Sequence, residues 1–281
     1  MVQLRYFEPA PAARPHISCL YSFSTPFAMT DMLRAEVPNL RIFLKGGVTV
    51  TRAGERRTYR APVILLCGPT MNAGTIEMWP DTTLIGASIL PAGWHACFGL
   101  DASEMTNRFE DCEGIAPVLL KSVLDAMQEA STPEVAIAYL EHALVRLGAQ
   151  REARQQPFID AASIWLATGN ISQVDNLLAE ADLSQRQVER LCHRYFGGSP
   201  KRLQRKFRTL RANNALVWND LTDWRDAAGE DYYDQSHFIR DFKEFIGFTP
   251  KQFSNEYRAL MRSALVLRRT IQHVHPISLV A

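Results

Sequence analysis

Two short stretches in the last third of the chain place polar side chains opposite an apolar helical stripe. In the first, residues 184–195, the apolar positions at i, i+3, i+4 and i+7 are Val188, Leu191, Cys192 and Tyr195. The opposite face then carries Gln185, Arg186, Glu189 and Arg190. Arginine can pair with guanine, glutamine with adenine, and glutamate with the amino group of cytosine. This face therefore suits base edges in a major groove, although any solvated helix also presents charges opposite its apolar stripe.

The second stretch begins near Asp234 and has an aromatic stripe. Its apolar positions at i, i+4 and i+7 are Phe238, Phe242 and Phe245. Its opening and outer surface carry Gln235, Ser236, His237 and Arg240. A histidine such as His237, taken alone, is more often packed or solvated than in contact with a ligand.

A strongly basic helix is predicted between these two stretches. Ser199 is a good N-cap, and Pro200 suits the first helical position. The basic residues of this helix are Lys201, Arg202, Arg205, Lys206, Arg208 and Arg211. Up to about Trp218 it would span about 27 Å, a useful spacer between two units on DNA. Phosphate contacts are predicted for Lys201 and Arg202, and for the N-cap hydroxyls of Ser172 and Ser184.

The charge distribution indicates a polyanionic partner for this end of the chain. Residues 184–270 contain 17 Lys/Arg and 10 Asp/Glu, a net charge of +7. The remaining residues contain 14 Lys/Arg and 20 Asp/Glu, a net charge of −6, so the overall charge of +1 hides the asymmetry. A locally basic segment of this kind is typical of nucleic-acid binding.

Each of the two stretches is preceded by a short helix and a tight turn. A helix over 157–168 is followed by a stop at Gly169-Asn170, and Ser172 then caps a short helix that leads into a turn at 181–183. In the second unit a short helix over 224–229 and a turn at 231–233 lead into the aromatic stretch. The sequence therefore predicts two helix-turn-helix units.

The motif residues of these units resemble the DNA-binding domain of AraC/XylS regulators. In the second unit the resemblance rests on Tyr233 to Phe238, Arg240, Phe242-Lys243 and Gly247 to Pro250. In the first unit and the spacer it rests on Leu183-Ser184, Arg186, Arg190, Gly197, Ser199-Pro200, Arg211 and Ala215. It covers about residues 158–260. Two positions depart from the family pattern: Cys192 stands where an aromatic is usual, and Asp231 where a glycine is usual in a turn.

The resemblance implies a seven-helix domain whose two recognition helices enter successive major-groove segments on one side of the duplex. Carried over to this sequence, it implies Arg186, Glu189 and Arg190 as base readers of the first helix. For the second helix it implies Gln235, Ser236, His237 and Arg240. Double-stranded operator DNA is then the main partner, and RNA polymerase is a partner expected from the family. Such regulators are more commonly activators than repressors, so activation is expected. Homodimerisation is a further expectation, and no cofactor is implied.

The sequence pattern of the N-terminal half is typical of an antiparallel β-barrel or sandwich. Short strand-like runs broken by turn residues are expected at 40–44, 48–51, 63–67, 75–79 and 84–90. Helical periodicity follows Pro117, over 118–127 and again after Thr132 as N-cap and Pro133 as the first helical residue. The predicted fold class is a multidomain α+β chain, with a β-rich barrel-like domain and helices ahead of an all-α domain of two helix-turn-helix units.

The predicted domain boundaries lie where the sequence changes from strand-like to helical patterns. We expect a β-rich sensor domain over 1–117, a helical linker or interaction segment over 118–156, the DNA-binding domain over 157–262 and a tail over 263–281. Residues 86–93, with Leu100, Ser103 to Met105 and Arg108-Phe109, resemble the β-rich domain that precedes some AraC-type units. That resemblance implies a small effector or dimer contacts. The effector and the residues that would bind it stay unidentified, and a pure dimerisation or protein-interaction module is the alternative.

Several function classes are disfavoured by the sequence. His16, His95 and His142 lie too far apart to suggest a metal site, and no Gly-x-Ser-x-Gly or P-loop pattern is present, so we expect neither an enzyme nor a metal or cofactor. No apolar run is long enough to cross a membrane, which favours a cytoplasmic location. The five cysteines form no CxxC pair and are expected to be reduced and buried.

Overall fold

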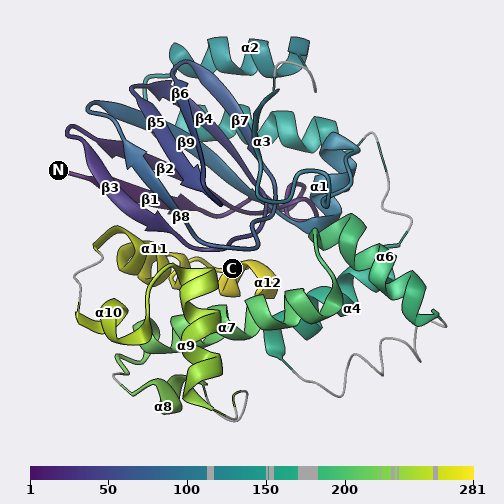
Figure 1. Cartoon of the computed structure of the whole chain (residues 1–281). Coiled ribbons are helices and arrows are strands. Elements are labelled where there is room, and N and C mark those ends of the chain that lie inside the picture. The colour runs from purple at the N-terminus through teal and green to yellow at the C-terminus, as the bar shows by residue number, and fades with distance from the viewer. Residues whose placement is uncertain are drawn as a thin grey trace.

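The computed structural model describes residues 1–112, 117–149, 151, 155–169, 183–221, 223–228, 232, 234–255 and 259–281. Ser172, the short helix predicted after it, its turn at 181–182 and Asp231 lie outside the described residues. The described residues form a β-sheet domain and a helical domain that lie against one another, with the sheets above the helical domain in Figure 1. Within the described residues, none of the helices combines the length and apolarity that a membrane crossing requires.

The N-terminal part is a sandwich of two antiparallel sheets. The six-stranded sheet has the order β1-β2-β9-β4-β7-β10 and the four-stranded sheet the order β3-β8-β5-β6. The strands are β1 (Gln3–Phe7), β2 (Ile17–Thr25), β3 (Met29–Leu33), β4 (Asn39–Lys45), β5 (Gly47–Arg52), β6 (Glu55–Arg60), β7 (Val63–Cys67), β8 (Gly74–Met78), β9 (Thr82–Ile89) and β10 (Phe109–Asp111). The predicted β-rich domain is confirmed, and the five strands expected from the sequence are β4, β5, β7, β8 and β9.

Three helices belong to the same domain as the strands. They are α1 (Pro91–Phe98), α2 (Pro117–Gln128) and α3 (Pro133–Gly148). Thr132 caps α3 by accepting a hydrogen bond from the backbone N–H of Val135, and Pro133 takes the first helical position, as predicted. Leu140 and Leu144 of α3 pack in one hydrophobic cluster with strand residues such as Leu40 and Ile42. Segment 118–156 was expected to be a helical linker or interaction segment; it forms two helices, as expected, and they pack into the core of the β-sheet domain.

The C-terminal helices build a second core. They are α4 (Gln156–Thr168), α6 (Gln185–Phe196), α7 (Pro200–Trp218), α8 (Trp224–Ala228), α9 (Gln235–Ile246), α10 (Pro250–Asn255), α11 (Ala259–Arg269) and α12 (Pro276–Val280). The long helix α7 follows α6 directly, and α9 packs along its first half through Arg202, Arg205 and Arg208. Its N-cap is Ser199 with Pro200 at the first position, as predicted. The combination of an N-terminal sheet domain and a C-terminal helical domain confirms the predicted fold class.

The last residues are packed into the molecule, although a tail was predicted over 263–281. Ile277 of α12 is fully buried in the helical core, and α12 contacts α4 and α7. Arg268 of α11 donates hydrogen bonds to the backbone oxygens of Ser278 and Ala281. The sequence signal was weak here because α12 is only five residues long and lacks a helical period.

Buried polar groups join the two domains. Arg34, which follows β3, donates hydrogen bonds to the side chains of Asn213 (3.3 Å) and Asn214 (2.8 Å) on α7. Lys206 of α7 reaches back, and its Nζ donates to the backbone oxygen of Glu36 at 2.8 Å. Glu36 is itself ion-paired with Arg41 at 2.6 Å. These contacts fix α7 against the edge of the sandwich.

The ammonium group of Lys206 is one of the buried cations of this interface, and its hydrogen-bond partner there is a backbone oxygen rather than a carboxylate. Its side chain is almost fully buried. Burial is the main cause that lowers the pKa of Lys206 to about 7; Glu36 opposes the shift, and Arg34 and Arg52 add to it. The ordinary pKa is 10.5, so between about pH 7 and 10.5 the unfolded chain holds a proton that the folded chain releases. The stability contributed by this group is therefore present above this range and is lost as pH falls through it.

We expect Lys206→Met to raise the free energy of unfolding by about 1–4 kcal/mol, most strongly below pH 7. The substitution removes a buried charge, and the oxygen of Glu36 keeps the backbone N–H of Thr70 as a donor at 3.1 Å. Urea unfolding at pH 6 and pH 9 measures the effect. Lys201→Met, at an exposed position of the same helix, is the control and should change stability little at either pH. Equal stability of the Lys206→Met protein and the parent at pH 6 would contradict the assignment.

Candidate nucleic-acid interface

Helix α6 forms as the sequence predicts. Ser184 accepts a hydrogen bond from the backbone N–H of Gln187, and the side chain of Gln187 accepts one from the backbone N–H of Ser184, which closes a capping box. The apolar side is buried and comprises Val188, Leu191, Cys192, Tyr195 and Phe196. The four predicted base readers are exposed and comprise Gln185, Arg186, Glu189 and Arg190.

The departure from the family pattern at Cys192 is a packing substitution. The side chain is buried in the helical core. Burial raises the pKa of the Cys192 thiol to about 12, with Glu189 adding to the effect. The thiol is therefore protonated at neutral pH, which fits a structural role better than a reactive one.

Helix α9 repeats this design with aromatic residues. Asp234 caps it by accepting a hydrogen bond from the backbone N–H of His237 at 2.8 Å. Four apolar side chains are fully buried: Phe238, Phe242, Phe245 and Ile246. Gln235, Ser236 and Arg240 are exposed, whereas His237 is only partly exposed.

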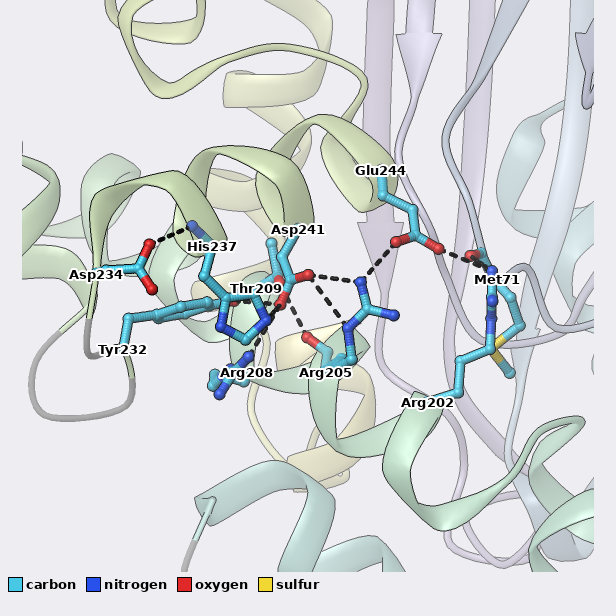
Figure 2. A network of polar contacts seen from close by, with 10 residues as sticks. All are labelled: Met71, Arg202, Arg205, Arg208, Thr209, Tyr232, Asp234, His237, Asp241 and Glu244. Atoms are coloured by element: carbon cyan, nitrogen blue, oxygen red, sulfur yellow. Dashed lines mark hydrogen bonds and ion pairs between the residues drawn. The ribbon is translucent and has the colours of Figure 1, made fainter.

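A buried carboxylate attaches α9 to the spacer helix α7 (Figure 2). Asp241 is fully buried, and its two oxygens bind Arg205 at 2.6 Å and Arg208 at 2.9 Å. Tyr232 donates a further, longer hydrogen bond of 3.3 Å to the same carboxylate. Because an uncompensated carboxylate would be very costly in this position, the arginines hold α9 at a fixed place along α7.

His237 lies next to the same carboxylate. Its Nε2 is 3.6 Å from Oδ2 of Asp241, and its ring contacts the ring of Tyr232 edge-on. A base contact by His237 would compete with this position. Gln235, Ser236 and Arg240 therefore offer the more accessible reading surface of α9.

The two residues at the start of α7 that were predicted to contact phosphate have different surroundings. Lys201 is exposed. Arg202 is engaged within the protein, because its guanidinium binds Glu244 at 2.9 Å and the backbone oxygen of Met71 at 3.0 Å (Figure 2). Arg205 is likewise paired with Glu244 at 2.8 Å in addition to Asp241. Much of the basic charge that the sequence assigned to phosphate contact therefore stabilises the packing of α7 on α9.

Sequence analysis missed Asp241 and Glu244 as positioning residues. Both lie more than 30 residues from the arginines that they bind. The available signal was the spacing of Asp241 on the apolar side of α9, directly before Phe242. A charged residue among buried aromatics requires a fixed partner of opposite charge.

We expect Asp241→Ala to lower the free energy of unfolding by about 3–5 kcal/mol, since it leaves the arginines facing a gap in place of a carboxylate. Chemical denaturation followed by circular dichroism measures the loss. Asp226→Ala, at an exposed position on α8, is the matched control and should stay within about 0.5 kcal/mol of the parent. A loss no larger than that of the control would show that the ion pairs contribute little.

Comparison with known proteins bears on the last third of the chain. The helix-turn-helix domain family matches residues 177–256, which include α6, the spacer helix and α9. Comparison with curated protein sequences gives no match.

Three solved structures illustrate the range of similarity in shape. ToxT from Vibrio cholerae O395, bound to (E)-4-(8-methylnaphthalen-1-yl)but-3-enoic acid, is 10% identical, with a TM-score of 0.49 over 90% of this chain and 98% of that chain. The AraC-like transcriptional activator CuxR is 14% identical, with a TM-score of 0.34 over 76% of this chain and 87% of that chain. A cupin superfamily protein from Desulfitobacterium hafniense is 11% identical, with a TM-score of 0.27 over 32% of this chain and 77% of that chain. At these values the similarities concern general shape alone.

The family match covers both capped helices, α6 and α9. The match begins ahead of α6 and ends after α9, so it contains both predicted reading helices. Its limits fall inside the range 158–260 over which the motif residues resemble AraC/XylS regulators. The protein therefore carries, in its last third, the AraC-type helix-turn-helix DNA-binding domain of transcription regulators.

Proposed function

We propose that the protein is a sequence-specific transcription regulator, an activator, that reads its operator with α6 and α9. The observation that carries the proposal is the pair of capped amphipathic helices α6 and α9, each with exposed polar side chains at its N-terminal half. Such a regulator works where the DNA is, which we take to be the cytoplasm. RNA polymerase is its proposed second partner.

Selection of bound duplexes from a random pool, followed by mobility shift at about 0.15 M salt, tests this function. We expect a defined sequence with two half-sites to bind at least 10³-fold more tightly than random duplex. Uniform weak affinity for every duplex would overturn the proposal, because phosphate contacts alone bind without sequence preference.

We expect Arg186→Ala and Arg240→Ala each to relax base preference at one position of the operator. The cost is about 1–3 kcal/mol if the exposed guanidinium forms a bidentate contact with guanine. Affinities for operators altered one base pair at a time measure the effect. Arg225→Ala, an exposed arginine on α8 outside both reading helices, serves as the control. An unchanged base preference in the Arg186→Ala protein would remove this residue from the reading surface.

Lys201→Ala should weaken binding to all sequences about equally. As an exposed phosphate contact, Lys201 would release about one counterion, so its removal should reduce the slope of log affinity against log salt by about one. Titrations between 50 and 200 mM salt measure the slope. Arg202→Ala is expected to change the slope less, because Arg202 is held by Glu244 and Met71.

We also propose that a small effector controls the regulator from a cavity between the domains. The cavity has a volume of about 140 Å³ and lies between the sandwich and α11. Its wall is mainly apolar, with Phe23, Ile76 and Leu265 among the lining residues. Its charged lining residues have both signs: Asp31, Arg34, Glu36, Arg41 and Arg268. An occupant would touch both domains at once, which supports a small amphipathic molecule as the effector.

Thermal unfolding of the protein with a panel of small amphipathic metabolites tests the effector site. A ligand should raise the unfolding temperature of the parent and of Val266→Trp, which changes an exposed residue of α11. It should not do so in Ala264→Trp, which fills the cavity from the same helix. The same ligand effect in all three proteins would place the binding site elsewhere.

Homodimerisation or partner binding is a second candidate for the event that controls the regulator. It is favoured by two large apolar side chains on α3, Val135 and Tyr139, which are 39% and 44% exposed and lie one helical turn apart. Sedimentation of the full chain distinguishes the two inputs. A tight dimer that dissociates in Tyr139→Glu and is indifferent to metabolites would favour the interaction module over the effector.

A further inference from the structure

Both reading helices end on the β-sheet domain. At the end of α6, the backbone N–H of Ala102 donates to the oxygen of Arg194 at 2.7 Å, and the hydroxyl of Thr106 donates to the oxygen of Gly197 at 2.8 Å. At the end of α9, the backbone N–H of Ala73 donates to the oxygen of Glu244 at 2.8 Å. The N-terminal domain thus supplies donors to the last turn of each helix.

These contacts occupy equivalent places in the two units. Each helix has 12 residues, Arg194 and Glu244 are each third from the end, and a left-handed glycine follows, Gly197 or Gly247. Each glycine N–H satisfies a single carbonyl, that of His193 or Lys243. The other carbonyls of a last turn need outside donors, and here several of them find these donors in the β-sheet domain. The backbone N–H of Ala35 adds a bond of 2.7 Å to Phe245.

The two segments that donate to Arg194 and Glu244 are joined to each other. We call residues 68–73 and 101–108 together the platform. The N–H of Gly68 donates to the oxygen of Arg108 at 3.0 Å, and the N–H of Asn107 donates to the oxygen of Pro69 at 3.0 Å. The side chain of Asn107 accepts a bond from the N–H of Met71 at 2.7 Å. Asn107 has a φ of +62°, a conformation that asparagine adopts more readily than most residues.

Side chains strengthen both attachments. Asp101 of the platform pairs with Arg194 of α6 at 3.2 Å. On the other side, Arg202 links Glu244 of α9 to the backbone oxygen of Met71, as Figure 2 shows. Gly197 packs so closely against Pro69 and Thr106 that a Cβ there would come within 2.6 Å of both. The platform is therefore in direct contact with both units.

We propose that the platform sets the spacing and relative orientation of the two reading helices, and that Asn107 and Thr106 are positioning residues for operator recognition. The inference rests on the proposed function. Neither residue needs to touch DNA, because the N-terminal halves of α6 and α9 carry the predicted readers. Loosening the platform should leave each helix able to read its own half-site while the preference for one distance between half-sites declines.

The test compares the selected operator with versions in which one base pair is inserted or deleted between the half-sites. We expect the parent to bind the native spacing most tightly. In Thr106→Val and Asn107→Ala the ratio of affinities between native and altered spacing should fall about fivefold, the usual effect of one hydrogen bond. Asn107→Asp keeps the acceptor for Met71 and should restore the ratio. Ser103→Ala, at an exposed position of the same loop, is the matched control.

Binding to a duplex with one half-site scrambled separates positioning from general damage. This binding should stay unchanged in Thr106→Val, because the substitution leaves the backbone of the platform intact. If Asn107→Ala does not fold, Thr106→Val alone tests the proposal. An unchanged spacing ratio in Thr106→Val overturns the proposal, and so does an equal loss on the scrambled duplex. A parent protein without sequence preference would instead refute the proposed function.

Discussion

Buried charge between the two domains is the constraint on which the rest of the structure depends. A charged or strongly polar group removed from water needs a partner at a fixed distance, and the partners here belong to different domains. Arg34 binds Asn213 and Asn214, and Lys206 binds the backbone of Glu36. Because these groups lose their hydrogen bonds if the domains separate, the interface has one favoured arrangement. The cavity beside α11 lies within that arrangement, so an occupant would act directly on the relation between the domains.

The same logic operates inside the helical domain. The carboxylate of Asp241 lies among aromatic side chains and binds two arginines of the spacer helix. Helix α7 has 19 residues and is about 28 Å long, and its first half holds α9 through Arg202, Arg205 and Arg208. Successive turns of the major groove are about 34 Å apart, so two units held on one rigid helix engage them together only where their spacing matches or the DNA bends. Any mismatch would add a deformation of the operator to the energetics of its base contacts.

Local signals in the sequence predicted most helix boundaries. Thr132, Ser184, Ser199 and Asp234 are the N-caps of their helices, because a side-chain oxygen that satisfies an orphan N–H depends only on neighbours in sequence. Strands were harder to predict. The five that were missed include β6, whose sequence ERRTYR is dominated by charge and becomes a strand only by pairing with β5. The packing of α12 depends in the same way on contacts that no local pattern encodes.

The sequence predicted which side chains of the candidate site are exposed, but not which residues the basic side chains bind. The reading faces of α6 and α9 follow from helical periodicity, and the exposed positions agree with that period. Arg202 was predicted to contact phosphate, and Arg205 and Arg208 were counted with it as basic residues of the spacer helix, whereas in the fold all three bind Asp241 or Glu244. A one-dimensional charge pattern shows how many cations a segment has, but the partner of each cation is decided by tertiary contacts. The base-reading and phosphate roles themselves remain predictions.

The platform contacts both reading helices, and this has a consequence for how such a protein can change during evolution. Residues 68–73 and 101–108 lie outside the segment that matches the helix-turn-helix family, and they bind backbone atoms of α6 and α9. Substitutions there could shift the two helices together without altering a single base-contacting side chain. A lineage could in this way retain its half-site sequences and still acquire promoters with a different separation between them, by mutations outside the helices that carry the predicted base readers.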